Sequence, residues 1–272
     1  MTETAQAIDP YPPPHKGRVI AVTNQKGGVG KTTTALNLAT ALAIAGRRVL
    51  IVDVDPQGNL TSGVGLRGQR GTDGSVYEAV TTDPRAGDVF VVPTRVANLF
   101  LMPADRNLTG AEIELVMLPE RERRLQRVLD PLRQGFDYIL IDCPPSLGLL
   151  TLNALVAADA VLIPLHCEYF ALEGLADLVA TLRRVRAALN PTLDIEGVLL
   201  TMYDERTNLG QLVARDVREF FREKVFNTII PRNVKLGEAP SHGIPGVIYD
   251  AKSRGAAAYA ALAKEVLARY AA

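Results

Sequence analysis

A glycine-rich stretch near the start of the chain, NQKGGVGKTTT (24–34), has the residue types and spacing that bind phosphate groups. It follows an apolar run that predicts a β-strand and precedes a segment that predicts a helix, which is the context a phosphate-binding loop requires. The glycines let backbone N–H groups approach phosphate oxygens, and the helix N-terminus adds partial positive charge. Lys31 can reach the terminal phosphates, and the Thr32 hydroxyl can bind magnesium.

The same stretch departs from the usual pattern, G-x-x-x-x-G-K-[ST], at two positions. Gln25 stands where a glycine is expected, and Lys26 adds a second lysine ahead of Lys31. One lysine normally suffices for the phosphates of a single nucleotide. Lys26 therefore needs a role of its own.

Three aspartates follow two other apolar runs and supply the acidic groups of a magnesium-dependent site. Asp142 lies in YILIDCPPS, where the proline pair should stop the strand, at the place of a Walker B acid. Asp53 and Asp55 lie in VLIVDVDPQGN, and in a regular strand their side chains would point to the same side. One could orient an attacking water and the other could support magnesium through its water shell. For Asp53 alone, capping or turn formation is the alternative.

Short β-branched runs alternate with longer segments of helical periodicity along the rest of the chain. Nearly continuous apolar runs are typical of strands buried on both faces of a parallel sheet, and they predict strands over 18–24, 48–55, 98–104, 137–144, 160–166, 197–203 and 227–231. Helices are predicted over 30–45, 110–118, 120–133, 147–158, 171–189, 208–223 and 254–270.

This alternation predicts a single-domain α/β fold, with a doubly wound, mostly parallel sheet and helices on both of its faces. Ligands of such sheets bind at the carboxyl ends of the strands. The domain is expected over 18–272, and the Pro-rich segment 1–17 is expected to be a disordered tail.

The composition excludes several classes of protein. Lys plus Arg and Asp plus Glu both total 30 over 272 residues, so bulk charge argues neither for nor against nucleic acid, and any basic surface would have to be local. The cysteines Cys143 and Cys167 are too few for a disulfide framework or a zinc site, which favours a cytoplasmic setting. No apolar stretch approaches the roughly 20 residues of a membrane span, and segment 1–17 lacks the features of a signal peptide.

Two further patterns predict structure rather than chemistry. GVGLRG (63–68) matches G-x-G-x-x-G, but no helix follows it, so we interpret it as a loop. PERERRLQRVL (119–129) has charges at helical spacing and predicts a solvated amphipathic face.

Several motifs together resemble one known family. KGGVGKTT (26–33) is similar to the deviant Walker A motif of the ParA/MinD group of P-loop ATPases, in which the glycine missing at Gln25 is dispensed with. DVDPQGN, LIDCPPS, TMYDERTNLG and IPRNVKLGEAPSHG resemble the ParA/Soj branch, which partitions chromosomes and plasmids. The resemblance runs from about Arg18 to the end of the chain, with the motifs in the family's order.

The resemblance implies an ATPase that uses ATP and Mg²⁺. Lys26 would reach the nucleotide of a second subunit in an ATP-sandwich homodimer, where a fixed cation stabilises the charge that grows during phosphoryl transfer. Lys31 and Asp55 would complete the catalytic set, with Asp55 orienting water, and Asp142 would serve magnesium alongside Thr32 and Asp53. The expected nucleotide contacts are Lys26, Gly27, Gly28, Val29, Gly30, Lys31, Thr32, Thr33 and, near the adenine, Pro231 and Asn233. The absence of an Asn-Lys-x-Asp sequence favours ATP over GTP.

Double-stranded DNA, bound without sequence preference, is the second partner that the resemblance implies. Residues 206–254 carry nine basic against five acidic residues. The family's DNA-binding positions fall on Arg206 and Lys235, and Lys252 and Arg254 would extend that surface. A dimer doubles the number of phosphate contacts, so DNA binding would follow nucleotide state. The alternative is that these residues are ordinary solvated charges.

The expected cycle is ATP binding, dimerisation, nucleoid binding and release when a ParB-type centromere-binding protein stimulates hydrolysis, in the cytoplasm and on the nucleoid. A MinD-like membrane regulator should end in a basic amphipathic helix, whereas GAAAYAALAKEVLARYAA predicts a helix that packs on the domain. An iron–sulfur reductase would need a companion for Cys143. Positioning of some other cargo by the same ATPase core stays open.

Overall fold

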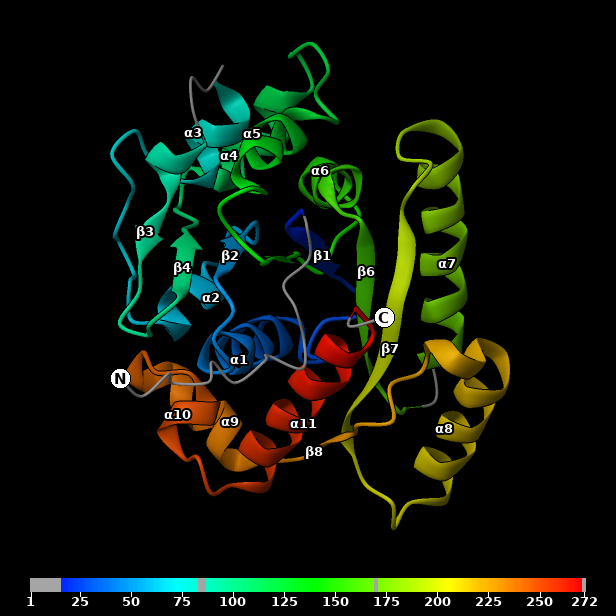
Figure 1. Cartoon of the computed structure of the whole chain (residues 1–272). Helices are drawn as coiled ribbons and strands as arrows, with labels where there is room; N and C mark the ends of the chain where they lie inside the picture. Colours follow the sequence, from blue (N-terminus) through cyan, green and yellow to red (C-terminus); the bar gives the residue numbers. More distant parts are fainter. Residues whose placement is uncertain (1–15, 83–86, 169–170, 271–272) are drawn as a thin grey trace, which may run out of the picture.

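The computed structural model describes residues 16–82, 87–168 and 171–270. The tail predicted over 1–17 lies outside these ranges except for its last two residues. An eight-stranded sheet, in the order β3-β4-β2-β5-β1-β6-β7-β8, runs through the molecule (Figure 1). Its strands are β1 (Arg18–Val22), β2 (Val49–Asp53), β3 (Val92–Pro93), β4 (Leu99–Met102), β5 (Tyr138–Asp142), β6 (Ala160–His166), β7 (Asp194–Tyr203) and β8 (Ile230–Pro231).

All neighbouring strands are parallel except β3, which runs antiparallel to β4. Within the described residues, eleven α-helices connect or flank the strands: α1 (Lys31–Ile44), α2 (Asn59–Gly63), α3 (Val76–Thr81), α4 (Leu108–Leu115), α5 (Arg124–Leu132), α6 (Leu149–Ala157), α7 (Ala171–Ala188), α8 (Asn208–Phe221), α9 (Val234–Glu238), α10 (Gly246–Tyr249) and α11 (Arg254–Ala268). Short 3₁₀ turns η1 (Asp88–Phe90), η2 (Arg222–Lys224) and η3 (Ala239–His242) complete the described elements.

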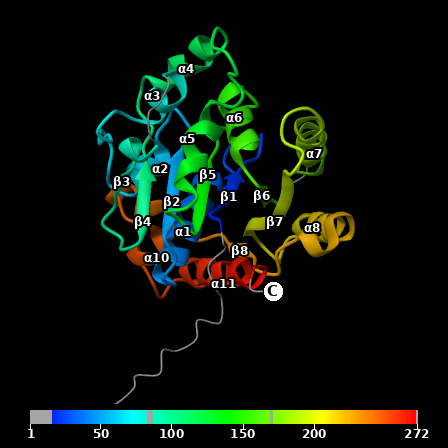
Figure 2. The ribbon, with the colours of Figure 1, turned by 45° about the horizontal axis from the view of Figure 1, so that its top comes forward.

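The sheet divides the interior into two apolar cores. Val19 and Ala21 of β1 pack with residues of α3 to α8, whereas Ile20 and Val22 pack with residues of α1, α2, α9, α10 and α11. Successive strand side chains point to opposite faces, so an unbroken apolar run is what a strand covered on both sides requires. Figure 2 shows helices on either side of the strands. The predicted mostly parallel, doubly wound sheet is confirmed.

The last helix packs on the domain, as its alanine-rich sequence predicted, and the helix that it packs against is the first. The buried Tyr259 of α11 reaches the buried Thr34 of α1, with 3.1 Å between their hydroxyl oxygens. Leu262 and Val266 of α11 are fully buried in the same core. The larger residues of α11 thus pack beside α1 in this core.

The observed elements differ from the prediction mainly at strand ends and in short helices. The strand predicted over 48–55 ends at Asp53, and those predicted over 137–144 and 227–231 are shorter as well. Helices α2, α3, α9 and α10 were not predicted, because four to six residues carry too little periodicity. Beyond Gly63, which ends α2, GVGLRG forms a loop with positive φ at Gly65 and Gly68, as expected.

The charged run 119–129 is only partly solvated. Arg124, the first residue of α5, is buried, and its Nε donates to the carbonyl of Val80 over 3.0 Å. A guanidinium can be buried where backbone carbonyls satisfy its N–H groups. The prediction of a solvated face is therefore wrong for Arg124, which ties α5 to the end of α3.

Candidate functional site

The acidic residues and the glycine-rich loop lie together at the carboxyl edge of the three central strands. In the strand register Asp142 of β5 stands beside Val22 of β1 and Asp53 of β2. The loop from β1 to α1 begins just beyond Val22. The topology thus brings together residues that are far apart in sequence, as the parallel sheet predicted.

The glycine-rich loop presents backbone donors that have no partner inside the described parts of the chain. Gly28 and Gly30 adopt left-handed φ angles of 72° and 88°, which residues with side chains rarely adopt. Helix α1 starts directly after Gly30, with no side chain capping its first turn. Among described residues, the backbone N–H groups of Gly28 and Gly30 find no acceptor. Such donors at a helix N-terminus suit the oxygens of a phosphate.

Asn24 holds the start of this loop against the sheet. The buried Asn24 donates from Nδ2 to the carbonyl of Pro164 on β6 over 2.8 Å, and its Oδ1 accepts the N–H of Lys26 at 3.1 Å. Sequence reasoning gave Asn24 no role. The signal that could have identified it is a polar residue at the end of an otherwise apolar strand.

Lys31 is buried beneath the loop, next to the acidic residues. Its Nζ donates to the carbonyl of Lys26 over 3.1 Å, and its side chain is only slightly exposed. Burial lowers the pKa of Lys31, and the nearby charge of Asp142 opposes this change, followed by smaller contributions that include Asp55. Lys31 is therefore a cation held inside the site, where its charge acts with little screening by water.

Asp142 is fully buried, and neither of its carboxylate oxygens has a hydrogen-bond partner of good geometry among the described residues. Burial raises the pKa of Asp142 well above its usual range, and the charge of Asp53 adds to this effect, while contact with the Thr32 hydroxyl opposes it. A buried carboxylate without donors is costly unless a cation approaches it. This orphaned acid fits a magnesium site.

Asp53 and Asp55 have different surroundings, so the prediction that both extend one regular strand is wrong. β2 ends at Asp53, whose Oδ2 accepts both the Thr61 hydroxyl at 2.6 Å and the Thr61 N–H at 2.8 Å. Burial raises the pKa of Asp53 to about 6, against these hydrogen bonds. Asp55 lies in the turn that follows, where its Oδ1 accepts the N–H of Gln57 at 2.9 Å. Its other oxygen, Oδ2, has no partner in the hydrogen bonds of the described chain.

No group of three or more His, Cys, Asp or Glu residues among the described ones could hold a metal alone. This fits magnesium in phosphate-binding loops, where a hydroxyl, phosphate oxygens and waters supply most of the ligands. Asp142 and Thr32 lie close enough to serve there. Asp53 already accepts hydrogen bonds at both oxygens, from Thr61 and from the N–H of Asp55 at 3.3 Å.

Lys26 does not reach into this site. Its ammonium group is paired with Glu168 in the loop after β6, and both side chains are partly exposed. The other oxygen of Glu168 lies 2.9 Å from Nδ1 of His166. The ammonium group of Lys26 holds the pKa of Glu168 below its usual range. Sequence reasoning missed Glu168, which lies 142 residues away from Lys26.

The two residues expected near an adenine lie at the same edge of the sheet. Pro231 ends β8 beside Tyr203 of β7, and Asn233 caps α9 by accepting the N–H of Lys235 at 2.8 Å. Both are partly exposed. The structure therefore leaves them accessible from the carboxyl edge.

The four residues expected to bind DNA are exposed, and two of them form ion pairs within the chain. Arg206, in the loop between β7 and α8, pairs with Asp204 through both Nε at 2.9 Å and Nη2 at 2.7 Å. Lys235 of α9 pairs with Glu238 at 2.9 Å. Lys252 and Arg254 lie around the start of α11 and are exposed. Helices α9, α10 and α11 pack together, so the last three residues belong to one region of the surface.

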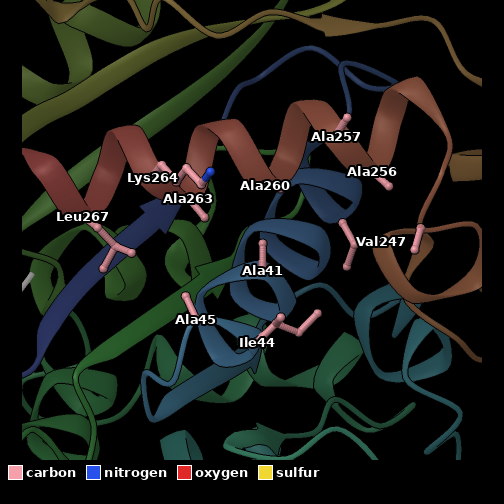
Figure 3. A pocket seen from close by; sticks show the side chains of 11 residues that line it. Ala41, Ile44, Ala45, Val247, Ala256, Ala257, Ala260, Ala263, Lys264 and Leu267 are labelled. Atoms are coloured by element: carbon pink, nitrogen blue, oxygen red, sulfur yellow. The ribbon is translucent and has the colours of Figure 1, made fainter. Parts of the chain in front are cut away.

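One apolar groove of the described chain contains none of the predicted site residues. It lies between α1 and α11, has a volume of ≈ 350 Å³, and is lined mostly by alanines such as Ala41 and Ala260, with Ile44 at its rim (Figure 3). No helix of the described chain is long and apolar enough to cross a membrane. Because the groove is lined mostly by apolar side chains, the polar carboxyl edge of the sheet is the candidate site for chemistry.

Comparison with known proteins identifies close relatives across nearly the whole chain. A family model described as an AAA domain matches residues 17–195. The chain is 57% identical over 252 residues to the sporulation initiation inhibitor protein Soj of Bacillus subtilis, covering 93% of this chain and 99% of that protein. It is 54% identical over 253 residues to the chromosome partitioning protein ParA of Myxococcus xanthus, covering 93% and 89%.

A solved structure of similar fold is the cobyrinic acid a,c-diamide synthase of Mycobacterium smegmatis with bound ATP analogue and magnesium. It is 40% identical, has a TM-score of 0.79, and the match covers 93% of this chain and 96% of that one.

The unpartnered carboxylate of Asp142 generates a testable prediction. Asp142→Asn removes a buried ionisable group whose charged form is disfavoured by burial and which no donor of good geometry satisfies in the described chain, so we expect the nucleotide-free protein to unfold at a higher temperature than the wild type near neutral pH. If Asp142 supports magnesium, the same change should slow magnesium-dependent ATP hydrolysis by about 10- to 100-fold. Calorimetry and a phosphate-release assay measure the two effects. A lower unfolding temperature with unchanged hydrolysis would contradict this role.

Proposed function

Because the chain belongs to the Soj/ParA family of chromosome-partitioning ATPases, we propose that it is an ATPase that pairs around ATP and binds DNA only as the pair. The observation that carries this proposal is the placement of the two lysines. Lys31 is buried beside Asp142, whereas Lys26 projects from the same loop and is paired with the partly exposed Glu168. A lysine outside its own site is suited to the site of a second copy.

ATP would bind at the glycine-rich loop, through the contacts expected from Lys26 to Thr33 and from Pro231 and Asn233. Thr32 and Asp142 would hold magnesium, and the metal would neutralise charge on the phosphates. Asp53 would support the magnesium site indirectly, through its hydrogen bonds to Thr61 and to the turn that contains Asp55. The N–H groups of Gly28 and Gly30, which have no acceptor among the described residues, and the ammonium group of Lys31 would bind phosphate oxygens.

Hydrolysis would require the attacking water to be oriented in line with the leaving phosphate. Asp55 is the acid available for this role, because it lies in a turn at the edge of the site and one of its oxygens has no hydrogen bond in the described chain. Lys26 of the partner subunit would add the second cation beside the γ-phosphate, where negative charge grows. Nucleotide binding and dimerisation would thereby be coupled.

DNA would bind to the exposed arginine and lysines of the pair. Arg206 and Lys235 form exposed ion pairs with Asp204 and Glu238, and such pairs contribute little stability. Exchange of these carboxylates for DNA phosphates is therefore easy, and the contacts would carry no sequence preference. Lys252 and Arg254 would add to the surface.

In the proposed cycle, a ParB-type centromere-binding protein stimulates hydrolysis, and the separated subunits leave the DNA. This places the protein in the cytoplasm and on the nucleoid. The second candidate, positioning of a non-DNA or other cargo by a MinD-like mechanism, shares the ATP site. It is distinguished by what the pair binds, namely lipid or another partner in place of DNA.

Asp55→Ala gives the most direct test of the whole proposal. Because the substitution removes the group that orients water but leaves the phosphate contacts, we expect an ATP-bound dimer that hydrolyses slowly and sediments together with random-sequence DNA. Analytical ultracentrifugation with ATP or ADP, with and without DNA, measures both properties. A monomer at saturating ATP would refute the pairing, and sedimentation with lipid vesicles in place of DNA would favour the MinD-like alternative.

Lys26 and Glu168 allow the role of the second lysine to be tested from both sides. Lys26→Ala should bind ATP as a monomer, because the contact to the second nucleotide is lost. Glu168→Gln should dimerise at a lower ATP concentration, because the ion pair that retains Lys26 within its own chain is weakened. Light scattering against ATP concentration measures both effects.

The matched control for these variants is Lys224→Ala, which removes another partly exposed lysine from an ion pair, here with Asp194 at 2.7 Å. It should dimerise as the wild type does. Unchanged dimerisation and turnover in Lys26→Ala would refute action across the interface.

Arg206→Glu tests the DNA surface without touching the ATP site. The change reverses an exposed charge, so we expect DNA affinity to fall and its salt dependence to become shallower, while ATP-dependent dimerisation persists. Arg183→Glu makes the same charge reversal on α7 and should leave DNA binding unchanged. Fluorescence anisotropy with a labelled duplex at several salt concentrations measures the difference. Wild-type affinity in Arg206→Glu would mean that this arginine is an ordinary solvated charge.

A further inference from the structure

A buried threonine far along the chain contacts the glycine-rich loop from below. Thr201 lies near the end of β7 and is 2% exposed. Its hydroxyl donates to the carbonyl oxygen of Val29 over 2.8 Å, a bond between residues 172 positions apart. β7 is not a neighbour of β1, because β6 lies between them. The bond therefore crosses the end of β6 to reach the loop.

The Thr201 side chain also lies near Gly30. A Cβ atom placed on Gly30 would lie 3.9 Å from both Cβ and Cγ2 of Thr201. The side chain thus faces the glycine whose φ of 88° turns the chain into α1. One side chain fixes the carbonyl of Val29 and lies beside the residue that follows it.

The backbone of β7 is irregular at this point. Met202, the next residue, has a φ of 48°, a left-handed value that is unusual for a residue with a side chain. The register with β8 shifts between Thr201 and Tyr203, which marks a bulge. Bulges near functional sites redirect a side chain, and strained backbone persists where surrounding contacts hold it.

The hydrogen bond from Thr201 also determines the orientation of a backbone N–H group that could bind phosphate. This N–H belongs to Gly30, in the peptide that joins Val29 to Gly30. A trans peptide is planar, so its C=O and N–H groups point in opposite directions. Thr201 holds the C=O, and the N–H of Gly30 must then point away from β7. This N–H is among the donors without a partner in the described chain.

We propose that Thr201 is a positioning residue for nucleotide binding, because its hydroxyl fixes the Val29–Gly30 peptide so that the Gly30 N–H faces the phosphates. This inference rests on the proposed ATP site. In this inference, a residue of β7, which lies outside the glycine-rich motif, helps to hold the loop in the conformation that binds phosphate. A loop with that peptide free to rotate would have to order it on binding, which weakens affinity.

Thr201→Val tests this role because it keeps the shape and the methyl group but removes the hydroxyl. We expect the affinity for magnesium–ADP and magnesium–ATP to fall about tenfold, the effect of losing one well-placed hydrogen bond. Thr201→Ser restores the hydroxyl and should bind within about twofold of the wild type. Fluorescence titration of the full chain with labelled nucleotides measures each affinity, and thermal unfolding without nucleotide measures each stability.

Thr40→Val is the matched control. Thr40 is fully buried in α1, and its hydroxyl also donates to a carbonyl over 2.8 Å, that of Leu36. Its loss should change stability but leave nucleotide affinity at the wild-type value. If Thr201→Val does not fold, Thr201→Ala carries the same expectation, since it too lacks the hydroxyl.

The outcomes separate this inference from the proposed function. A wild-type protein that binds neither nucleotide refutes the ATP site itself. A wild type that binds, together with Thr201→Val of equal affinity, refutes only the role of Thr201. Equal weakening in the Val and Ser variants assigns the effect to packing and also refutes it.

Discussion

The candidate site depends on one constraint: the central strands are apolar and buried on both faces, so charged groups can be placed only where those strands end. β1, β2 and β5 carry buried residues through to their last positions, and Asp53 and Asp142 are the residues at which two of them stop. Parallel strands end at one common edge. The loop that follows β1 therefore meets both acids, and Lys31 brings the compensating charge.

The polar groups at this edge do not all have partners within the described chain, and those without partners can bind a ligand. Asp53 is satisfied by Thr61, whereas Asp142 has no donor of good geometry in the described chain. Lys31 is desolvated and donates to a carbonyl of its own loop. A site with one unsatisfied buried acid and free backbone donors is complementary to a metal-bound phosphate.

Outside the edge, Lys26, Arg206 and Lys235 all form ion pairs within the chain through exposed carboxylates. A chain of zero formal net charge thus keeps these three cations paired until stronger anions replace their partners.

Much of this arrangement could be predicted from the sequence, because the information is local. The roles of Lys31 and Thr32 follow from the spacing of the glycines, and Asp142 follows from an apolar run that stops at a proline pair. The difference between Asp53 and Asp55 could not be predicted, because it depends on where the backbone leaves the strand and on Thr61. Glu168 and Thr201 could not be found either, since each meets the loop only through the order of β1, β6 and β7. The short helices α9 and α10 lack the length that makes periodicity visible.

The two outer strands have a consequence for how copies of this protein can meet. β3 and β8 are each two residues long, and the second residue of each is a proline, Pro93 and Pro231. Proline lacks an amide hydrogen, and an edge strand of two residues offers almost no backbone hydrogen-bonding groups with which another chain could extend the sheet. Neither edge of the sheet therefore allows copies of the protein to add strands side by side and form fibres. Self-association must proceed through side chains and loops, where a small molecule can decide whether it happens.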